Sequence, residues 1–549
     1  MKISYPFDLY DAPVAANLKD VLETAAAKYG HRPAFVTAAK IGDPLQKISY
    51  SHFRDDVRYT ALGLMSALKI DLSRRDSKKI AIIAPNSYHW AVAYFAITCL
   101  GQVAVPLNPG LSATDLHALI TRAGATSVFF TSDTAAKIAQ LQQTLVKMKH
   151  FISLDDSPQA TITWAKVYAM GRRFSKRHPG AWSRVKIFSE SLAELLFTSG
   201  TTSAPKAVML THKNICACIN GINLVNRFCD DTMLAMLPLY HSYECTIGLC
   251  LQIFDGTTLY YLPGGLPHFA DNLKISRPTA IMAVPLIVEG TYQRVVAECG
   301  QGASQAQISA ALRDYYGGRC QRVFVGGAAV NSVITDAYEE AGMKVMQGYG
   351  ISECSPAVCM NPDKMHKHRS VGMPLPTLRV KINEPNSEGV GEVLVRGPSV
   401  MLGYYKDERR TDETLIDNWL HTGDLGKFDD DGFLYLVGRA RNVIIGKNAE
   451  TVYPEEIEFV LNNCPGIKEA MVYGKVVGDD TKVAALLVPD REYWSQHDDS
   501  VLNDAVVMQT RLQQVVDAAN QDLVRYKQVR DISVVDNLPK TATGKIKRQ

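Results

Sequence analysis

Residues 79–107, KIAIIAPNSYHWAVAYFAITCLGQVAVPL, form the apolar stretch that decides the fold. No Asp, Glu, Lys or Arg occurs from Ile80 to Thr114. A transmembrane helix needs about 20 uninterrupted apolar residues. Turn-forming residues interrupt this stretch at Pro85-Asn86, Gly101-Gln102 and Pro106. The pattern predicts a strand over 79–84, a helix over 88–100 and a strand over 103–107, a unit typical of a parallel sheet that is buried on both faces.

Similar patterns continue on both sides of this unit. Short β-branched or aromatic segments bounded by Gly, Pro or polar residues occur at 125–131, 257–262 and 322–325. Segments 379–383 and 391–396 alternate at period two, which predicts a smaller antiparallel piece. After residue 440 the pattern changes to strands over 470–473, 482–488 and 531–535, with a long charged helix over 500–523.

We therefore predict an α/β fold with two domains. Residues 1–440 would form a large N-terminal domain of layered parallel-sheet subdomains plus the small antiparallel piece. Residues 441–549 would form a small, mobile α+β C-terminal domain. At about 100–200 residues per domain, the length of 549 residues predicts two to four domains.

Charge and cysteine content narrow the class of protein. Lys and Arg number 59 and Asp and Glu 56, which argues against nucleic acid as a main partner. The 11 cysteines are scattered, and the N-terminus lacks the apolar region of a signal peptide. We expect a cytoplasmic protein with free thiols and no zinc site or transmembrane segment. No amphipathic membrane anchor is evident.

Residues 197–206, FTSGTTSAPK, are the most informative segment for chemistry. Hydroxyls and backbone amides around a glycine can hold phosphate oxygens, and a nearby lysine offsets their charge. The segment is not a Walker A loop, since no second Gly directly precedes Lys206. Taken alone, it is equally consistent with a solvated Ser/Thr turn.

Three further segments support nucleotide chemistry. Residues 347–353, QGYGISE, combine two glycines that admit a planar ring with a carboxylate suited to Mg²⁺. Residues 420–424, LHTGD, place an aspartate after a tight turn, where it could bind ribose hydroxyls. Residues 538–545, LPKTATGK, end in a lysine beside a glycine hinge. Each segment is weak alone, because surface turns of this composition are common.

Together, in this order and spacing, the segments resemble the adenylate-forming enzymes, which include acyl-CoA synthetases, luciferases and adenylation domains. The resemblance extends from about residue 17 to residue 549. Supporting segments are ISYSHF at 48–53, PLYH at 238–241, VGGA at 325–328 and GYY at 403–405. Gly438-Arg439 and the later segment YPEEIE at 453–458 are most similar to the fatty acyl-CoA synthetase branch.

The resemblance implies a ligase that uses ATP, Mg²⁺ and coenzyme A to activate a carboxylic acid, most simply a medium- or long-chain fatty acid. The resemblance implies that the phosphates are bound by Thr198, Ser199, Gly200, Thr201, Thr202 and Lys206. It implies that Mg²⁺ is bound by Thr201 and Glu353. Adenine contacts fall on Gly326, Gly327, Ala328, Gly348, Tyr349 and Gly350, and ribose contacts on Asp424 and Arg439. The implied catalytic residues are Lys545, His241, Glu353 and Thr198, and the implied domain hinge is Arg441.

The sequence leaves the roles of several residues open. His241 could be a core histidine, and the helix expected over 246–252 could wall an acyl pocket or be plain core. Ser203, Ala207 and Ala449 stand where family members usually carry Gly, and Ala449 weakens the expectation of thioester formation. Two alternatives follow: an acyl-AMP ligase that loads an acyl carrier protein in trans, or a binding protein that has lost turnover.

Overall fold

The computed structural model describes residues 5–71, 77–198, 205–228, 230–300, 302–327, 330–445, 451–477, 480–540, 546 and 548. The chain forms two compact units. Unit 1 contains the residues up to 198, then 205–380 and 395–420, and unit 2 contains 381–394 and the residues from 421 onward. The predicted domain boundary after residue 440 marks the point about which the small domain would move. That boundary stays a prediction.

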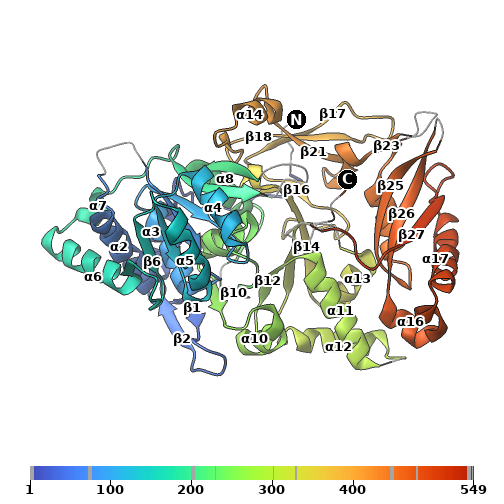
Figure 1. Cartoon of the computed structure of the whole chain (residues 1–549), viewed down its shortest axis with the longest axis horizontal. Coiled ribbons are helices and arrows are strands. Elements are labelled where there is room, and N and C mark those ends of the chain that lie inside the picture. Colours follow the sequence, from blue (N-terminus) through green and yellow to red (C-terminus); the bar gives the residue numbers. More distant parts are fainter. Residues whose placement is uncertain are drawn as a thin grey trace. The chain divides into compact units, whose positions relative to one another are not determined.

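An eight-stranded sheet confirms the α/β expectation for unit 1 (Figure 1). Its order is β19 (Gly403–Tyr404), β9 (Lys206–Thr211), β8 (Leu192–Thr198), β4 (Val103–Pro106), β3 (Lys79–Ile83), β5 (Ser127–Phe130), β6 (His150–Ser153) and β7 (Ile162–Thr163). Strands β3 and β4 are parallel neighbours. The long apolar stretch is thus the predicted strand–helix–strand unit.

Helix α3 (Tyr88–Thr98) connects these two strands and ends two residues before its predicted end. Ser87 begins the helix by accepting the N–H of Trp90. All of its residues except His89 are buried, and a helix that is apolar on every side is stable only inside a protein. No described helix is long and apolar enough to cross a bilayer.

Two smaller sheets complete the core of unit 1. One has the order β10 (Thr232–Leu234), β11 (Thr258–Tyr261), β1 (Pro33–Thr37) and β2 (Gln46–Ser49). The other has the order β12 (Ala280–Ala283), β13 (Arg322–Val325), β14 (Lys344–Gly350), β15 (Ala357–Met360) and β16 (Met373–Pro374). Strands β12, β13 and β14 are parallel, and β14 and β15 are antiparallel.

The remaining α-helices of unit 1 flank these sheets. They are α1 (Leu18–Tyr29), α2 (Tyr50–Ala67), α4 (Ala113–Ala123), α5 (Ala135–Thr144), α6 (Trp164–Arg177), α7 (Ala181–Arg184), α8 (His212–Asn223), α9 (Gln252–Asp255), α10 (Phe269–Ser276), α11 (Pro285–Cys299), α12 (Gln305–Tyr315), α13 (Ser332–Glu340) and α14 (Glu408–Thr414).

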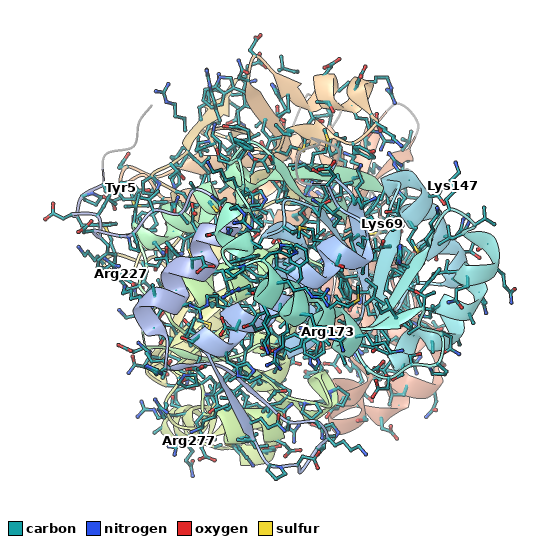
Figure 2. All side chains as sticks on the ribbon, turned by 90° about the vertical axis from the view of Figure 1, so that its left-hand side faces the viewer. Tyr5, Lys69, Lys147, Arg173, Arg227 and Arg277 are labelled. Carbon is teal, nitrogen blue, oxygen red and sulfur yellow. The ribbon has the colours of Figure 1, made fainter. Side chains whose placement is uncertain are left out.

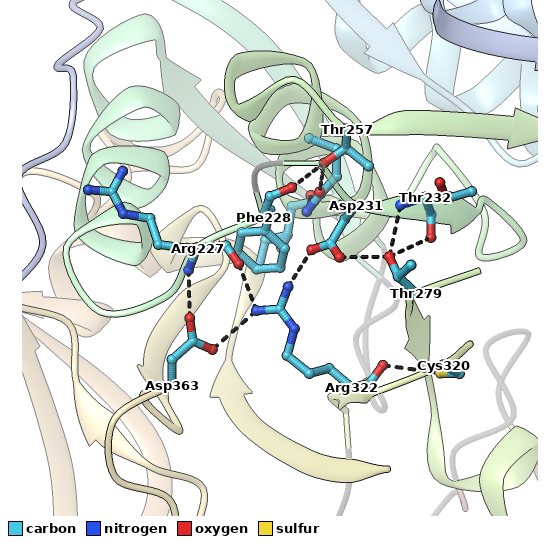
Figure 3. Close-up of polar contacts among 11 residues, drawn as sticks. Arg227, Phe228, Asp231, Thr232, Thr257, Thr279, Cys320, Arg322 and Asp363 are labelled. Carbon is cyan, nitrogen blue, oxygen red and sulfur yellow. Dashed lines mark hydrogen bonds and ion pairs between the residues drawn. The ribbon is translucent and has the colours of Figure 1, made fainter. Parts of the chain in front are cut away.

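A partly buried ionic network joins the two smaller sheets (Figure 3). Arg322, the first residue of β13, pairs with Asp231 just before β10, and its Nη1 lies 3.1 Å from Oδ1 of Asp363. Its guanidinium lies over the rings of Phe228 and Phe324, about 5 Å from their centroids. Because removing one partner would leave a partly buried charge uncompensated, the network helps to fix the start of β13.

An antiparallel piece follows in the chain, as the period-two alternation predicts. Its order is β17 (Arg379–Asn383), β18 (Gly391–Arg396), β21 (Trp419–Phe428) and β20 (Leu415–Ile416), with β22 (Leu434–Arg439) also paired to β21. Asp429 closes the β21–β22 turn by accepting the N–H groups of Asp431 and Phe433.

Unit 2 contains the predicted α+β domain. Strands β25 (Ile467–Val477), β26 (Asp480–Pro489) and β27 (Asp531–Val534) form its sheet. Its remaining elements are β23 (Ile444–Ile445), β24 (Thr451–Val452), α15 (Pro454–Asn462), α16 (Arg491–His497) and α17 (Ala505–Asn520). The long helix was expected from residue 500. It begins later because the Asp504 side chain accepts the N–H groups of Val506 and Val507 and caps it there.

Candidate active site

The segment expected to bind phosphates connects two antiparallel strands. Strand β8 ends at Thr198 and β9 begins at Lys206, and these two residues are opposite each other in the ladder. A Walker A loop leads from a strand into a helix, so the hairpin agrees with the absence of that motif. Several predicted site residues lie outside the described residues: Ser199, Gly200, Thr201, Thr202, Ala328 and Lys545.

Two predicted polar residues of unit 1 are joined through a third. The Tyr404 hydroxyl donates to Oε1 of Glu353 at 2.8 Å, and Nζ of Lys206 lies 3.5 Å from the same hydroxyl. The Lys206 ammonium also lies 4.9 Å from the centre of the Tyr404 ring. Burial and the adjacent Glu353 carboxylate raise the pKa of Tyr404, so the hydroxyl stays protonated and donates. Cation, phenol and carboxylate therefore form one continuous polar chain.

Backbone contacts hold Glu353 in place. The Met401 N–H donates to the carbonyl of Glu353 at 2.9 Å. The hydroxyls of the preceding residue, Ser352, and of Ser242 lie 3.2 Å apart. Within the described residues, Oε2 of Glu353 accepts no hydrogen bond, and the side chain is partly exposed. A carboxylate oxygen left available in this way suits a hard cation such as Mg²⁺.

The predicted adenine segments lie at the ends of adjacent parallel strands. Gly326 and Gly327 follow β13, and Tyr349 and Gly350 end β14. Gly327 has φ +96°, which favours glycine, and a Cβ on Gly326 would lie 3.3 Å from the Tyr243 ring. A Cβ on Gly348, one residue before Tyr349, would lie 3.4 Å from the Cys359 carbonyl oxygen, which is an ordinary van der Waals contact. Tyr349 itself is 7% exposed.

Gly350 has a packing requirement that the sequence does not reveal. A Cβ at this position would lie 2.4 Å from the carbonyl oxygen of Pro356, the residue just before β15. The β14–β15 register shifts between Tyr349 and Gly350, which brings these backbones close together. Any side chain here would displace the strand end that leads to Glu353.

His241 lies on a loop anchored by the apolar stretch. Asn86, which follows β3, donates from Nδ2 to the carbonyl of Leu237 at 2.6 Å and accepts the N–H of Leu239 at 2.9 Å. The ring of Tyr240 packs against that of His241 with centroids 4.6 Å apart. His241 is partly exposed and is not a fully buried core histidine.

A π-helix over Tyr243–Leu251 occupies most of the expected 246–252 helix. All residues from Glu244 to Leu251 are buried. Burial raises the pKa of Glu244 to about 8, so its carboxyl is mainly protonated at neutral pH. Gly248 provides the space for this carboxyl, because a Cβ there would lie 2.6 Å from it. Whether the π-helix also walls an acyl pocket stays a prediction.

In unit 2, Asp424 and Arg439 contact each other directly. Nε of Arg439 lies 2.7 Å from Oδ1 of Asp424, and the aspartate side chain is 7% exposed. We expected Asp424 to follow a tight turn, which is wrong: residues 419–428 form one strand, with a left-handed kink at Gly423 (φ +70°). The kink arises because both oxygens of Glu392 are engaged, one with His421 and one with the Gly423 N–H, each at 2.9 Å.

Arg441 lies in a short 3₁₀ turn, Ala440–Asn442, directly after β22. Burial and the neighbouring guanidinium of Arg439 lower the pKa of Arg441. Nothing in a single conformation tests whether the chain rotates here, so the hinge stays a prediction.

Sequence reasoning missed three residues that position this site. Tyr404 lies in a segment that carried the resemblance, but no role was assigned to it. Glu392 lies on β18, where the period-two alternation predicted a strand and no function. Asn86 was interpreted only as a break in the apolar stretch, although a polar residue just beyond a buried parallel strand is a common place for function.

The chain matches the AMP-binding enzyme family over residues 22–405 and the AMP-binding enzyme C-terminal domain over residues 456–545. The chain belongs to the AMP-binding enzyme family. The resemblance to adenylate-forming enzymes is thereby confirmed, and the protein is an enzyme of the adenylate-forming acid–CoA ligase family.

Relatives in bacteria carry a more specific name. A long-chain-fatty-acid–CoA ligase of Escherichia coli O157:H7 is 28% identical over 97% of this chain and 93% of its own length. The ligase of the same name in Haemophilus influenzae is 27% identical over 97% of this chain and 94% of its own length. Long-chain-fatty-acid–CoA ligase FadD15 of Mycobacterium tuberculosis is 27% identical over 82% of this chain and 79% of its own.

Solved structures confirm the fold. The anthranilate CoA ligase AuaEII superposes with a TM-score of 0.80 at 21% identity, covering 98% of this chain and 96% of that one. MatB from Rhodopseudomonas palustris superposes with a TM-score of 0.77 at 23% identity, covering 97% of both chains. At these identities the likeness concerns the fold and carries no information about the acid.

Proposed function

We propose that this protein is an ATP-dependent ligase that activates a medium- or long-chain fatty acid and forms its CoA thioester. The acid first attacks the α-phosphate of ATP to give acyl-AMP and pyrophosphate. The thiol of CoA then attacks the acyl carbon and releases AMP. The supporting observation is similarity over nearly the whole chain to ligases named for long-chain fatty acids, with the large and C-terminal family regions both present.

The first step needs charge stabilisation on the departing pyrophosphate. We assign this to Thr198 and the residues that follow it in the sequence, Ser199, Gly200, Thr201 and Thr202, with Lys206 neutralising the β- and γ-phosphates. Mg²⁺, held by Glu353 and Thr201, would supply further neutralisation of the phosphate oxygens when bound. Tyr404 acts as a positioning residue, because its hydroxyl holds Oε1 of Glu353 and lies against Lys206.

We assign the contacts to the nucleoside residue by residue. Gly326, Gly327, Ala328 and the segment Gly348-Tyr349-Gly350 would line the adenine. Asp424 would accept hydrogen bonds from the ribose hydroxyls. Arg439 fixes one oxygen of that carboxylate at 2.7 Å, so we assign it mainly to orienting Asp424.

The reacting carboxylate would lie near His241, and Lys545 would bridge the carboxylate and the α-phosphate. A lysine is suited to this role because its ammonium attracts both groups and favours their approach in the transition state. For the second step, we propose that the small domain turns about Arg441, moving Lys545 away and bringing the segment near Asn448 toward CoA.

Product analysis tests this proposal. Purified protein is incubated with ATP, Mg²⁺, CoA and a panel of fatty and aryl acids, and products are identified by mass spectrometry. We expect acyl-CoA for a range of fatty acids, together with AMP and pyrophosphate. Acyl-AMP without acyl-CoA would instead favour a carrier-protein ligase, and acyl-CoA from aryl acids alone would refute the fatty-acid assignment.

A further inference from the structure

One part of unit 1 has a charge pattern unlike the rest of the chain. Residues 157–189 contain no Asp or Glu and seven of the 59 basic residues. The seven are Lys166, Arg172, Arg173, Lys176, Arg177, Arg184 and Lys186, and all are exposed. Since the whole chain has a net charge of only +3, the remainder is net negative. The positive charge is therefore concentrated on one segment.

Close helix packing holds this segment in place. Helix α6 packs against α2 with almost no space between the backbones. A Cβ on Gly171 would lie 1.7 Å from the Tyr59 carbonyl oxygen, and one on Gly63 would lie 1.9 Å from that of Val167. Nη2 of Arg58 on α2 also donates to the Ser175 hydroxyl at 2.9 Å. The inner face of α6 is therefore fixed on α2, and its basic residues face solvent.

Among the described residues, these cations have no carboxylate partners. Within the described ranges, none of the seven forms an ion pair with Asp or Glu, whereas exposed helices elsewhere do pair their charges. Arg294 pairs with Glu298 on α11, and Arg409 pairs with Glu413 on α14, each four residues apart. On α6 the corresponding positions carry like charges, as with Arg173 and Arg177, which repel each other. Such a face is stabilised when an anionic partner approaches.

The basic surface continues beyond α6. Arg184 ends α7 and Lys186 follows it, and Figure 1 shows α6 and α7 at the same end of unit 1. Figure 2 looks directly at this end, where Arg173 is labelled. Phe188, two residues after Lys186, is 73% exposed. A large exposed aromatic close in sequence to exposed basic residues suits the interface of a bilayer, where a ring can enter among the headgroups.

We propose that the α6–α7 face, defined as residues 164–188, docks the protein on anionic phospholipid bilayers. Clusters of four to eight Lys or Arg on a helix favour anionic lipid headgroups. The choice of a bilayer over another polyanion rests on the proposed function, because a long-chain acid is concentrated in membranes. The apolar side of α6 is covered by α2, so the attraction is electrostatic, with Phe188 as an added contact.

Vesicle binding tests this proposal. Wild-type protein is mixed with vesicles of pure phosphatidylcholine or with about 30% phosphatidylglycerol, and the bound fraction is measured by flotation at low and high salt. The test variant is Arg173→Gln/Lys176→Gln/Arg177→Gln. The matched control, Lys274→Gln/Arg319→Gln/Lys344→Gln, removes three exposed cations elsewhere on unit 1. Thermal unfolding confirms that both variants fold.

We expect the wild-type protein and the control variant to bind anionic vesicles and to bind neutral vesicles only weakly. High salt should release the protein from the anionic vesicles. Each cation contributes about a fivefold factor, so the test variant should bind about 100-fold more weakly. Equal binding by the test variant would overturn the proposal, as would binding that ignores lipid charge. Stronger binding to duplex DNA than to vesicles at the same salt would assign the face to nucleic acid instead.

A second readout separates this proposal from the proposed function. Acyl-CoA formation is measured with a short, water-soluble acid and with a long-chain acid supplied in anionic vesicles. The test variant should match wild type on the soluble acid and lose rate on the vesicle-borne one. If wild type binds vesicles but makes no acyl-CoA from any acid, the docking surface stands and the proposed function fails.

Discussion

Unit 1 contains two tyrosine–glutamate hydrogen bonds that look alike and differ in their surroundings. Tyr94 on α3 donates to Oε2 of Glu194 on β8 at 3.1 Å, and Tyr404 donates to Oε1 of Glu353 at 2.8 Å. Glu194 is fully buried, and its Oε1 has no hydrogen-bond partner in the described residues. Glu353 is partly exposed and has Lys206 behind its tyrosine.

The difference shows that a shared hydrogen bond does not define a role. Burial raises the pKa of Glu194 to about 7, which favours a neutral carboxyl that holds a helix to a sheet. Glu353 is reached by solvent, and its Oε2 accepts no hydrogen bond from the described residues, so this carboxyl can receive a ligand. The following substitutions test this contrast, from the largest expected effect to the smallest.

Glu353→Gln should lower the rate of acyl-AMP formation up to about 1,000-fold, because the amide keeps the Tyr404 hydrogen bond but removes the negative charge offered to Mg²⁺. Pyrophosphate release in single-turnover reactions measures this loss. Glu194→Gln is the matched control and should retain the wild-type rate. Equal rates for the two variants would contradict the assignment of Glu353.

The pH dependence of stability should depend on Glu194. The pKa of its carboxyl is about 7 in the folded state against an ordinary value near 4.5, so between these values the folded state keeps a proton that the unfolded state loses. The contribution of Glu194 to the free energy of unfolding is most favourable below pH 4.5. It declines as the pH rises through 7, by about 3 kcal/mol at most.

Urea denaturation from pH 5 to pH 8 measures this decline. Glu194→Gln should flatten the curve relative to wild type. Glu244, with a pKa raised to about 8, and Asp255, with one raised to about 7, should leave some slope in the variant. A variant whose slope equals that of wild type would show that Glu194 does not titrate in this range.

Tyr94→Phe should lower the free energy of unfolding by about 2 kcal/mol, because it leaves both oxygens of a buried carboxyl without donors. The rate of acyl-AMP formation per folded molecule should be unchanged. Denaturant midpoints and active-site titration measure the two effects separately. A large loss of rate with unchanged stability would reverse the roles that we give to the two pairs.

Tyr404→Phe should have the smallest effect, about a tenfold lower rate of acyl-AMP formation, as expected when a residue that orients a ligand is removed. The phenyl ring keeps its packing, so stability should change little. An apparent Mg²⁺ requirement higher than in wild type would support positioning of Glu353, whereas an unchanged rate and Mg²⁺ requirement would remove that role.

The sequence predicted regular elements well where local pattern decides them. The β3–α3–β4 unit follows from apolar segments separated by Pro85-Asn86 and Gly101-Gln102, and β13 and β17 have their predicted bounds. Contacts between segments that are far apart in the sequence were harder to predict. The engagement of Glu392 with His421 and Gly423 spans about 30 residues, and it converts an expected turn at Asp424 into a kinked strand.

The same limit applies to the polar chain. Tyr404 and Glu353 are 51 residues apart, and Lys206 and Tyr404 are 198 apart. Their contact depends on β19 pairing with β9, an antiparallel addition to a mainly parallel sheet. Motif resemblance could indicate Lys206 and Glu353 separately, but only the sheet order places a tyrosine between them.

The most direct test of the central claim is ATP–pyrophosphate exchange in the absence of CoA. If a fatty acid is activated as acyl-AMP, labelled pyrophosphate should enter ATP only when the acid and Mg²⁺ are present. Glu353→Gln should nearly abolish the exchange and Glu194→Gln should leave it intact. Exchange that needs no acid, that requires CoA, or that is equal in the two variants would contradict the account.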